Sequence, residues 1–157
     1  MLSAFHVALS DPEQAAIEHW KGVACEACPD LKVDVTFAGI TRALLRYGLS
    51  SWVERVAEHG MKKASYQLHS LRLRTATFST KRPLLSLTDD LRNAIAVEAK
   101  TTEWHCKTFT CLLLFAALQY LPDENPEEVG EFFRQHLLEE AAAGLRRGRP
   151  RAPVEAS

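Results

Sequence analysis

Cys25 and Cys28 form a Cys-x-x-Cys pattern, which is the first arrangement in this chain that could do chemistry. Two thiolates at this spacing can supply half of a zinc site, with His105, Cys106 and Cys111 as candidates for the rest. On a helix, however, side chains five residues apart differ in direction by about 140°, so Cys106 and Cys111 are poorly placed to share one ion. A thioredoxin-type motif would follow a strand, whereas a helix is expected here. We therefore favour small buried hydrophobes, expect no cofactor, and keep zinc binding as the alternative.

The six histidines are scattered, and none stands in a zinc-binding pattern such as His-Glu-x-x-His. A Cys–His nucleophilic pair forms in space and not in sequence, so it stays an alternative, although no pattern supports it. Paired acids stand at or near expected helix starts, where they compensate the helix dipole. These pairs are Asp89-Asp90, Asp123-Glu124 and Glu127-Glu128. We expect no catalytic residue and interpret the protein as a non-enzyme.

A long basic segment is the strongest pattern in the chain. Residues 59–88 include no Asp or Glu, although the whole chain has 19 basic and 20 acidic residues. A surface of one sign attracts a partner of the opposite sign, and nucleic acid is the commonest strongly anionic partner. The candidate phosphate-binding residues are Arg42, Arg46, Lys62, Lys63, Arg72, Arg74, Lys81 and Arg82. A solvated helix face followed by a loop is the alternative interpretation of these charges.

Nucleic-acid binding requires the cations to share one open surface. Arg42 and Arg46 would add to Lys62 and Lys63 if their two helices pack as neighbours. An aromatic side chain beside them would then offer a stacking face to an unpaired base. The candidates are Tyr47, Tyr66 and Phe78. Such a surface would contact the backbone of the nucleic acid and would not read its sequence.

The apolar pattern predicts an all-α fold: a single compact bundle of five to seven helices with a short irregular segment in the middle. Helical spacing extends over about residues 10–28, 37–58, 61–71, 85–121 and 126–144. Gly48 with Ser50-Ser51 predicts a bend or division in the second of these, and Thr101-Thr102 a division in the fourth. Residues 71–78 alternate like a strand, and we favour an extended loop over a strand there.

The length favours one domain, residues 1–145, followed by an Arg- and Pro-rich tail at 146–157 that we expect to be flexible. The charge is unevenly distributed. Residues 1–34 hold six acids against two bases and residues 89–140 hold eleven against four, whereas residues 35–88 hold nine bases against two acids. Acidic flanks beside a basic centre can pair within one fold or between neighbouring copies.

Four cysteines without a recognisable secretory signal favour a reducing, cytoplasmic location. The longest apolar stretch, residues 111–121, has about half the length of a membrane span. We expect no membrane contact.

Three places in the chain carry a family resemblance. They are an early capped helix with Ala16 and Trp20 on its apolar face, the segment FAGITRALLRYGL at 37–49, and a Thr- and Leu-rich helix at 101–121. In type and order they resemble the small helical subunits of multi-subunit CRISPR effector complexes of type III and type IV, over about residues 12–121. The final helix and the arginine tail would be additions in this chain.

The resemblance implies a non-enzymatic subunit with a role in antiviral defence. It would stack in several copies inside a ribonucleoprotein effector complex and brace the guide and target strands. Its partners would be RNA or single-stranded DNA, other subunits of the complex, and copies of itself. The rival hypothesis is a protein–protein interaction module, such as an inhibitor, immunity or adaptor protein. That rival predicts an exposed apolar or acidic patch, and basic residues paired with Asp or Glu.

Overall fold

The computed structural model describes residues 2–6, 9, 11–75 and 84–144. Six α-helices make up most of this part of the chain, so the predicted all-α bundle of five to seven helices is confirmed. They are α1 (Asp11–Ala27), α2 (Phe37–His59), α3 (Met61–Thr75), α4 (Asp89–Ala99), α5 (Cys106–Tyr120) and α6 (Pro126–Ala142). Two 3-10 helices and two strands join them: η1 (Pro29–Asp34), η2 (Leu121–Asp123), β1 (Leu2–His6) and β2 (Leu84–Thr88). The predicted tail and most of the irregular segment lie outside the described residues.

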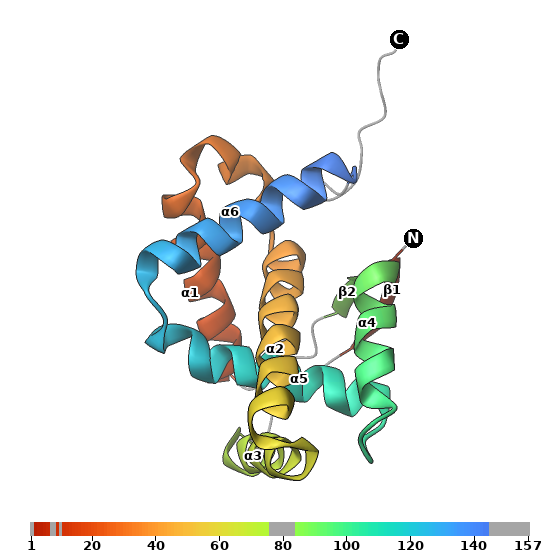
Figure 1. Ribbon diagram of the computed structural model, residues 1–157. Helices are drawn as coiled ribbons and strands as arrows, with labels where there is room; N and C mark the ends of the chain where they lie inside the picture. Colours follow the sequence, from red (N-terminus) through yellow and green to blue (C-terminus); the bar gives the residue numbers. More distant parts are fainter. Residues whose placement is uncertain (1, 7–8, 10, 76–83, 145–157) are drawn as a thin grey trace.

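The crossing of α2 and α5 forms the centre of the fold (Figure 1). A Cβ at Gly48 would lie 2.2 Å from the carbonyl oxygen of Leu113, so only glycine lets the two backbones come this close. The predicted bend or division of the second helix is therefore wrong. α2 runs without a break through Gly48, because this glycine admits α5 and does not end the helix.

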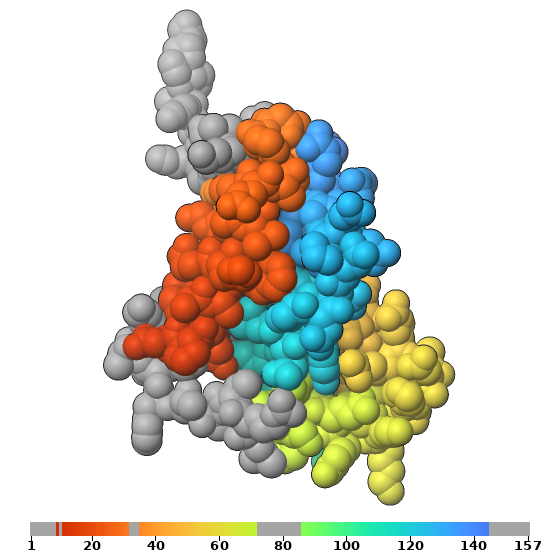
Figure 2. Space-filling model, turned by 90° about the vertical axis from the view of Figure 1, so that its left-hand side faces the viewer, coloured from red at the N-terminus to blue at the C-terminus, as the bar shows by residue number. Residues whose placement is uncertain are grey.

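The other elements surround this crossing. α3 lies across the C-terminal end of α2, and α4 with the β1–β2 ribbon lies on the opposite side from α1 (Figure 1). α1 and α6 lie side by side on the remaining face (Figure 2). The largest fully buried side chains include Trp52, Phe109 and Phe133, contributed by α2, α5 and α6 respectively. The core therefore connects α2 with the two helices at the C-terminal end of the described chain.

The division predicted at Thr101-Thr102 is confirmed. The hydroxyls of these two threonines donate to the carbonyl oxygens of Glu98 and Ala99, at 2.6 and 2.8 Å, and so satisfy the last turn of α4. Ending a helix in this way is the usual effect of such side chain–backbone competition.

Two extended segments differ from expectation. Residues 71–75, predicted as a loop or strand, continue α3, because Ala64, Leu68 and Leu71 bury one helical stripe. Residues 85–88, predicted as the start of a helical region, belong instead to β2 (Leu84–Thr88), which pairs antiparallel with β1. α4 begins only at Asp89, where the Thr88 side chain accepts a hydrogen bond from the Leu91 amide at 3.3 Å.

Candidate interaction surfaces

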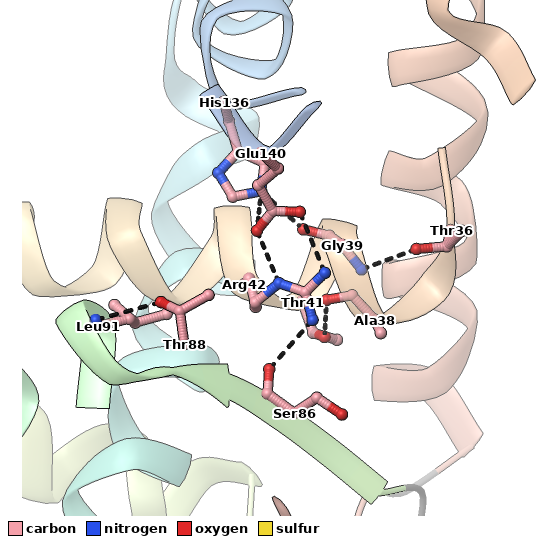
Figure 3. A network of polar contacts seen from close by, with 10 residues as sticks. All are labelled: Thr36, Ala38, Gly39, Thr41, Arg42, Ser86, Thr88, Leu91, His136 and Glu140. Atoms are coloured by element: carbon pink, nitrogen blue, oxygen red, sulfur yellow. Dashed lines mark hydrogen bonds and ion pairs between the residues drawn. The ribbon is translucent and has the colours of Figure 1, made fainter. Parts of the chain in front are cut away.

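Arg42 is excluded from any phosphate-binding surface. Its side chain is buried, with 6% of the residue exposed. Its Nε donates to Oε2 of Glu140 at 2.6 Å and one terminal nitrogen donates to Oε1 at 3.0 Å, while the other donates to the Ser86 carbonyl at 3.2 Å (Figure 3). The prediction that Arg42 binds nucleic acid is therefore wrong, because all three donor nitrogens are used inside the fold. The guanidinium instead joins α2, α6 and β2.

His136 completes this buried polar cluster (Figure 3). Its Nε2 lies 3.0 Å from the Gly39 carbonyl oxygen and 3.2 Å from Oε2 of Glu140, so Nε2 carries a proton and donates to both acceptors. Burial alone would raise the pKa of Glu140. Hydrogen bonds from His136 and Arg42 outweigh burial and lower the pKa to about 2, so the carboxylate stays ionised. A doubly hydrogen-bonded carboxylate of this kind is a structural group.

The remaining predicted cations do not gather around Arg42. Arg46 is half-buried beside a hollow of about 580 Å³ that is also lined by Glu54 and Asp90. It precedes the end of α2 by about thirteen residues, or roughly 20 Å of helix, and so lies far from Lys62 and Lys63 at the start of α3. The predicted single basic patch is not formed by the candidates whose side chains are described.

α3 presents a small basic face of its own. Lys62, Lys63 and His69 are exposed, and Tyr66 between them is 71% exposed. Arg72 and Arg74 belong to the same helix, but their side chains lie outside the described residues, as do Lys81 and Arg82 altogether. The helix contains no Asp or Glu. We refer to Lys62, Lys63, Tyr66 and His69 as the α3 face.

One concave surface of the molecule is acidic. A groove of about 740 Å³ lies where the second half of α2 meets the end of α5, η2 and the start of α6. Its charged and titratable lining consists of five acids against Arg55 and His59. The acids are Glu54, Glu58, Asp123, Glu124 and Glu128. They come from segments about 70 residues apart, so the acidic groove is a product of the fold.

Most of the charge in this groove is not neutralised by the same molecule. Among the described residues, Glu54, Asp123 and Glu128 have no ion-pair partner. Glu58 has only His59, whose Nε2 lies 3.2 Å from the carboxylate. The groove therefore keeps a negative field, and concave walls strengthen such a field.

The groove also has an aromatic wall that already holds one guanidinium. The central carbon of the Arg55 guanidinium lies 4.1 Å from the centre of the Tyr120 ring, within cation–π distance. Tyr47 and Phe132 meet edge to face beside it. The Tyr47 hydroxyl donates to Glu124 at 2.7 Å. The pKa of Tyr47 is raised well above its usual value, mainly by burial of the hydroxyl and in second place by its hydrogen bond to the Glu124 carboxylate. Carboxylates and ring faces together form a surface suited to arginine.

The sequence contained a signal for this groove that was assigned to helix capping. Dipole compensation accounts for part of Asp123-Glu124 and Glu127-Glu128, since at the start of α6 the Asn125 side chain accepts from the Glu127 and Glu128 amides. Residues 89–140 hold eleven acids and only four bases, which is more negative charge than the helix starts in this segment require for capping. That excess, with Glu54 and Glu58 on α2, was the available indication.

Cys28 and His105, two of the candidate zinc ligands, are placed for structural roles. Burial raises the pKa of the Cys28 thiol against an opposing effect of Arg134, which makes Cys28 a weak nucleophile. His105 caps α5, its Nδ1 accepting from the Lys107 amide at 3.2 Å. Among the described residues, no three His, Cys, Asp or Glu side chains come together as metal ligands. Within that same part of the chain, every helix is too short or too polar to cross a membrane.

Comparison with known proteins gives no relative from which a function could be transferred. The chain matches no protein-family model, no curated protein and no solved structure. Its function is therefore inferred from two surfaces, the acidic groove and the α3 face.

Proposed function

We propose that this protein is a non-enzymatic, cytoplasmic protein-binding module whose acidic groove receives a basic segment of a partner protein. The observation that carries the proposal is the groove itself: five acids converge on an aromatic wall, and three of them have no ion-pair partner in the part of the chain that the structure describes. Charge complementarity of this kind sets partner choice and speeds association.

The treatment of charge elsewhere in the molecule supports this choice over nucleic-acid binding. Arg42 is neutralised by Glu140, and Arg134 forms two parallel bonds to Asp30 at 2.8 and 2.9 Å. An acidic patch together with paired basic residues is what the protein–protein hypothesis predicts. A phosphate backbone passing near the groove would meet repulsion from five carboxylates.

An anisotropy titration with a fluorescent peptide of alternating Arg and Gly, unrelated to this chain, tests the proposal. A groove-neutral variant carries Glu54→Gln, Glu58→Gln and Glu128→Gln. A control-neutral variant carries Glu18→Gln, Glu103→Gln and Glu131→Gln, three exposed acids that do not line the groove. The two variants have the same net charge, so any difference in peptide binding between them is due to where the three acids lie and not to the total charge.

We expect the peptide to bind the wild type and the control-neutral variant alike, and the groove-neutral variant at least about tenfold more weakly, because close charge pairs contribute over 1.4 kcal/mol. A lysine peptide of equal charge should bind more weakly than the arginine peptide, since the ring contacts favour a planar guanidinium. Equal weakening in both variants would show a general charge effect and would refute the proposal.

The α3 face supports a second candidate function, the nucleic-acid-binding scaffold subunit implied by the resemblance to CRISPR small subunits. Lys62 and Lys63 stand in the first turn of α3, where positive charge opposes the helix dipole and costs stability. The exposed Tyr66 ring one turn later could stack on an unpaired base. Lys62 and Lys63 are unfavourable for the stability of α3, and an anionic partner would offset their charge, so these two lysines beside the exposed Tyr66 ring favour an anionic partner on the α3 face.

Salt dependence distinguishes this second function. Binding of single-stranded RNA or DNA should fall steeply with salt, with a slope close to the number of phosphates neutralised. Changing Lys62, Lys63, Arg72 and Arg74 together to Glu should abolish it, whereas the groove-neutral variant should retain or strengthen it. A flat salt response would exclude the scaffold function and leave the groove proposal intact.

A further inference from the structure

We infer that the occupant of the acidic groove is the arginine-rich segment 146–151 of a second copy of this chain, so that copies join head to tail. The inference rests on the proposed function and names the partner of the same groove. It is argued from charge, from the chemistry of the groove wall and from reach.

The segment has the charge that the groove lacks. Residues 145–157 include four arginines and one acid, whereas the groove has five acids. The arginines are Arg146, Arg147, Arg149 and Arg151. All four cations are arginine, none is lysine, and a guanidinium can bind a carboxylate through two parallel hydrogen bonds.

The groove already shows how it would hold such a side chain. Arg55 stacks on the Tyr120 ring at 4.1 Å, and its terminal nitrogen donates to Gln67 at 3.1 Å, so no carboxylate of the groove is consumed by this bond. Glu54 and Glu128 line the same groove, and both are exposed. A further guanidinium entering the groove would find both a ring face and an unpaired carboxylate.

The first arginines of the segment fall short of the groove of their own molecule. Glu128 and Phe132 line the groove from the first two turns of α6, and the arginines follow the other end of this helix. Between Glu128 and Gly144 lie about sixteen residues, or roughly 24 Å of helix. From Gly144, a fully extended chain reaches only about 10 Å at Arg147 and about 17 Å at Arg149. Arg146 and Arg147 therefore fall short of the groove of their own molecule, whereas the whole segment can enter the groove of another copy.

The position of the two partners along α6 sets the geometry of assembly. The acceptor groove is at the N-terminal end of α6 and the donor segment follows its C-terminal end in the sequence, so each copy offers one of each. Such a contact joins different surfaces of the two copies, and it extends into a ring or an open chain. Association should therefore continue past the dimer, and salt should weaken it.

Sedimentation velocity of the full chain tests the inference. At about 50 mM NaCl the wild type should associate beyond a dimer, and at about 300 mM the association constant should fall at least tenfold. The groove-neutral variant should be monomeric, and so should a tail-neutral variant with Arg146, Arg147, Arg149 and Arg151 all changed to Gln. The control-neutral variant should associate like the wild type.

Mixing the two monomeric variants gives the decisive result. The tail-neutral chain keeps a groove and the groove-neutral chain keeps a tail, so a mixture should form a one-to-one dimer that grows no further. Association of the groove-neutral variant alone, or a mixture that remains monomeric, would overturn the inference. If the wild type is monomeric while the unrelated arginine peptide still binds the groove, this inference falls and the proposed function stands. If that peptide fails to bind, the proposed function falls.

Discussion

The buried Arg42–Glu140 pair and the acidic groove are built on the same two helices, α2 and α6, and they treat charge in opposite ways. Where the first half of α2 meets the second half of α6, Arg42 and Glu140 neutralise each other in the interior. Where the second half of α2 meets the start of α6, Glu54 and Glu128 line an open groove, and neither has an ion-pair partner among the described residues. The first arrangement holds the helices together, and the second leaves charge available to a partner.

Breaking the buried pair should have the largest effect on stability. Glu140→Gln leaves the Arg42 charge buried without a counter-ion, so we expect the free energy of unfolding to fall by about 3–5 kcal/mol. The exposed neighbour provides the control, since Glu139→Gln should change stability by less than about 0.5 kcal/mol. Urea unfolding followed by circular dichroism measures both. Similar small effects for the two variants would contradict a structural role for the pair.

Acid should weaken the same pair. The pKa of Glu140 in the folded state is about 2, below its ordinary value of 4.5, so the ionised form favours folding above pH 4.5. That contribution, roughly 3 kcal/mol, is lost as the pH falls from 4.5 through 2. A double variant, Arg42→Met with Glu140→Leu, lacks this group, so its stability should depend less on pH in that window. Parallel pH profiles for wild type and double variant would refute the assignment.

A glycine pair tests the helix crossing on which both regions depend. Gly48→Ala places a methyl group against the Leu113 carbonyl and should destabilise the fold by about 1–3 kcal/mol, as overpacking does. Gly22→Ala in α1 meets no atom within 4 Å, so better helix propensity should stabilise the fold by up to about 1 kcal/mol. Thermal unfolding of the two variants should therefore shift in opposite directions.

Neutralising the groove should affect stability least. The groove-neutral variant removes three exposed carboxylates, of which, among the described residues, only Glu58 has an ion-pair partner, the neighbouring His59. Its stability should therefore stay within about 0.5 kcal/mol of the wild type or rise slightly as repulsion is relieved. The same variant should lose peptide binding. A loss of stability comparable to that of Glu140→Gln would mean that these acids are structural, and the contrast between the two ends of α2 and α6 would disappear.

Local sequence patterns predicted the helical elements well. Apolar spacing gave the helices, and Thr101-Thr102 marked a boundary, because capping and one-sided burial depend on neighbours in the chain. The prediction of a bend at Gly48 is wrong because a glycine is needed there to let the backbone of α5 come close at Leu113, 65 residues later in the sequence. β2 was missed because its partner β1 is at the other end of the sequence, where no local pattern refers to it.

The interaction surface was less accessible to prediction than the fold. The sequence shows how many charges of each sign a segment has, but only packing decides which of them are paired. Arg42 was counted with the basic residues, yet its carboxylate partner stands 98 residues later. Conversely, Glu54 and Glu128 look like ordinary surface acids until α2 and α6 place them in one groove.

Mapping the binding site by NMR tests the central claim most directly. An unlabelled Arg/Gly peptide is titrated into ¹⁵N-labelled protein, and the amide shifts are followed. We predict that the amides of Glu54, Arg55 and Glu128 shift in a saturable way and that those of Lys62 and Glu18 do not. Shifts spread over all exposed acids, or confined to α3, would contradict the claim that the groove holds the charges left for a partner.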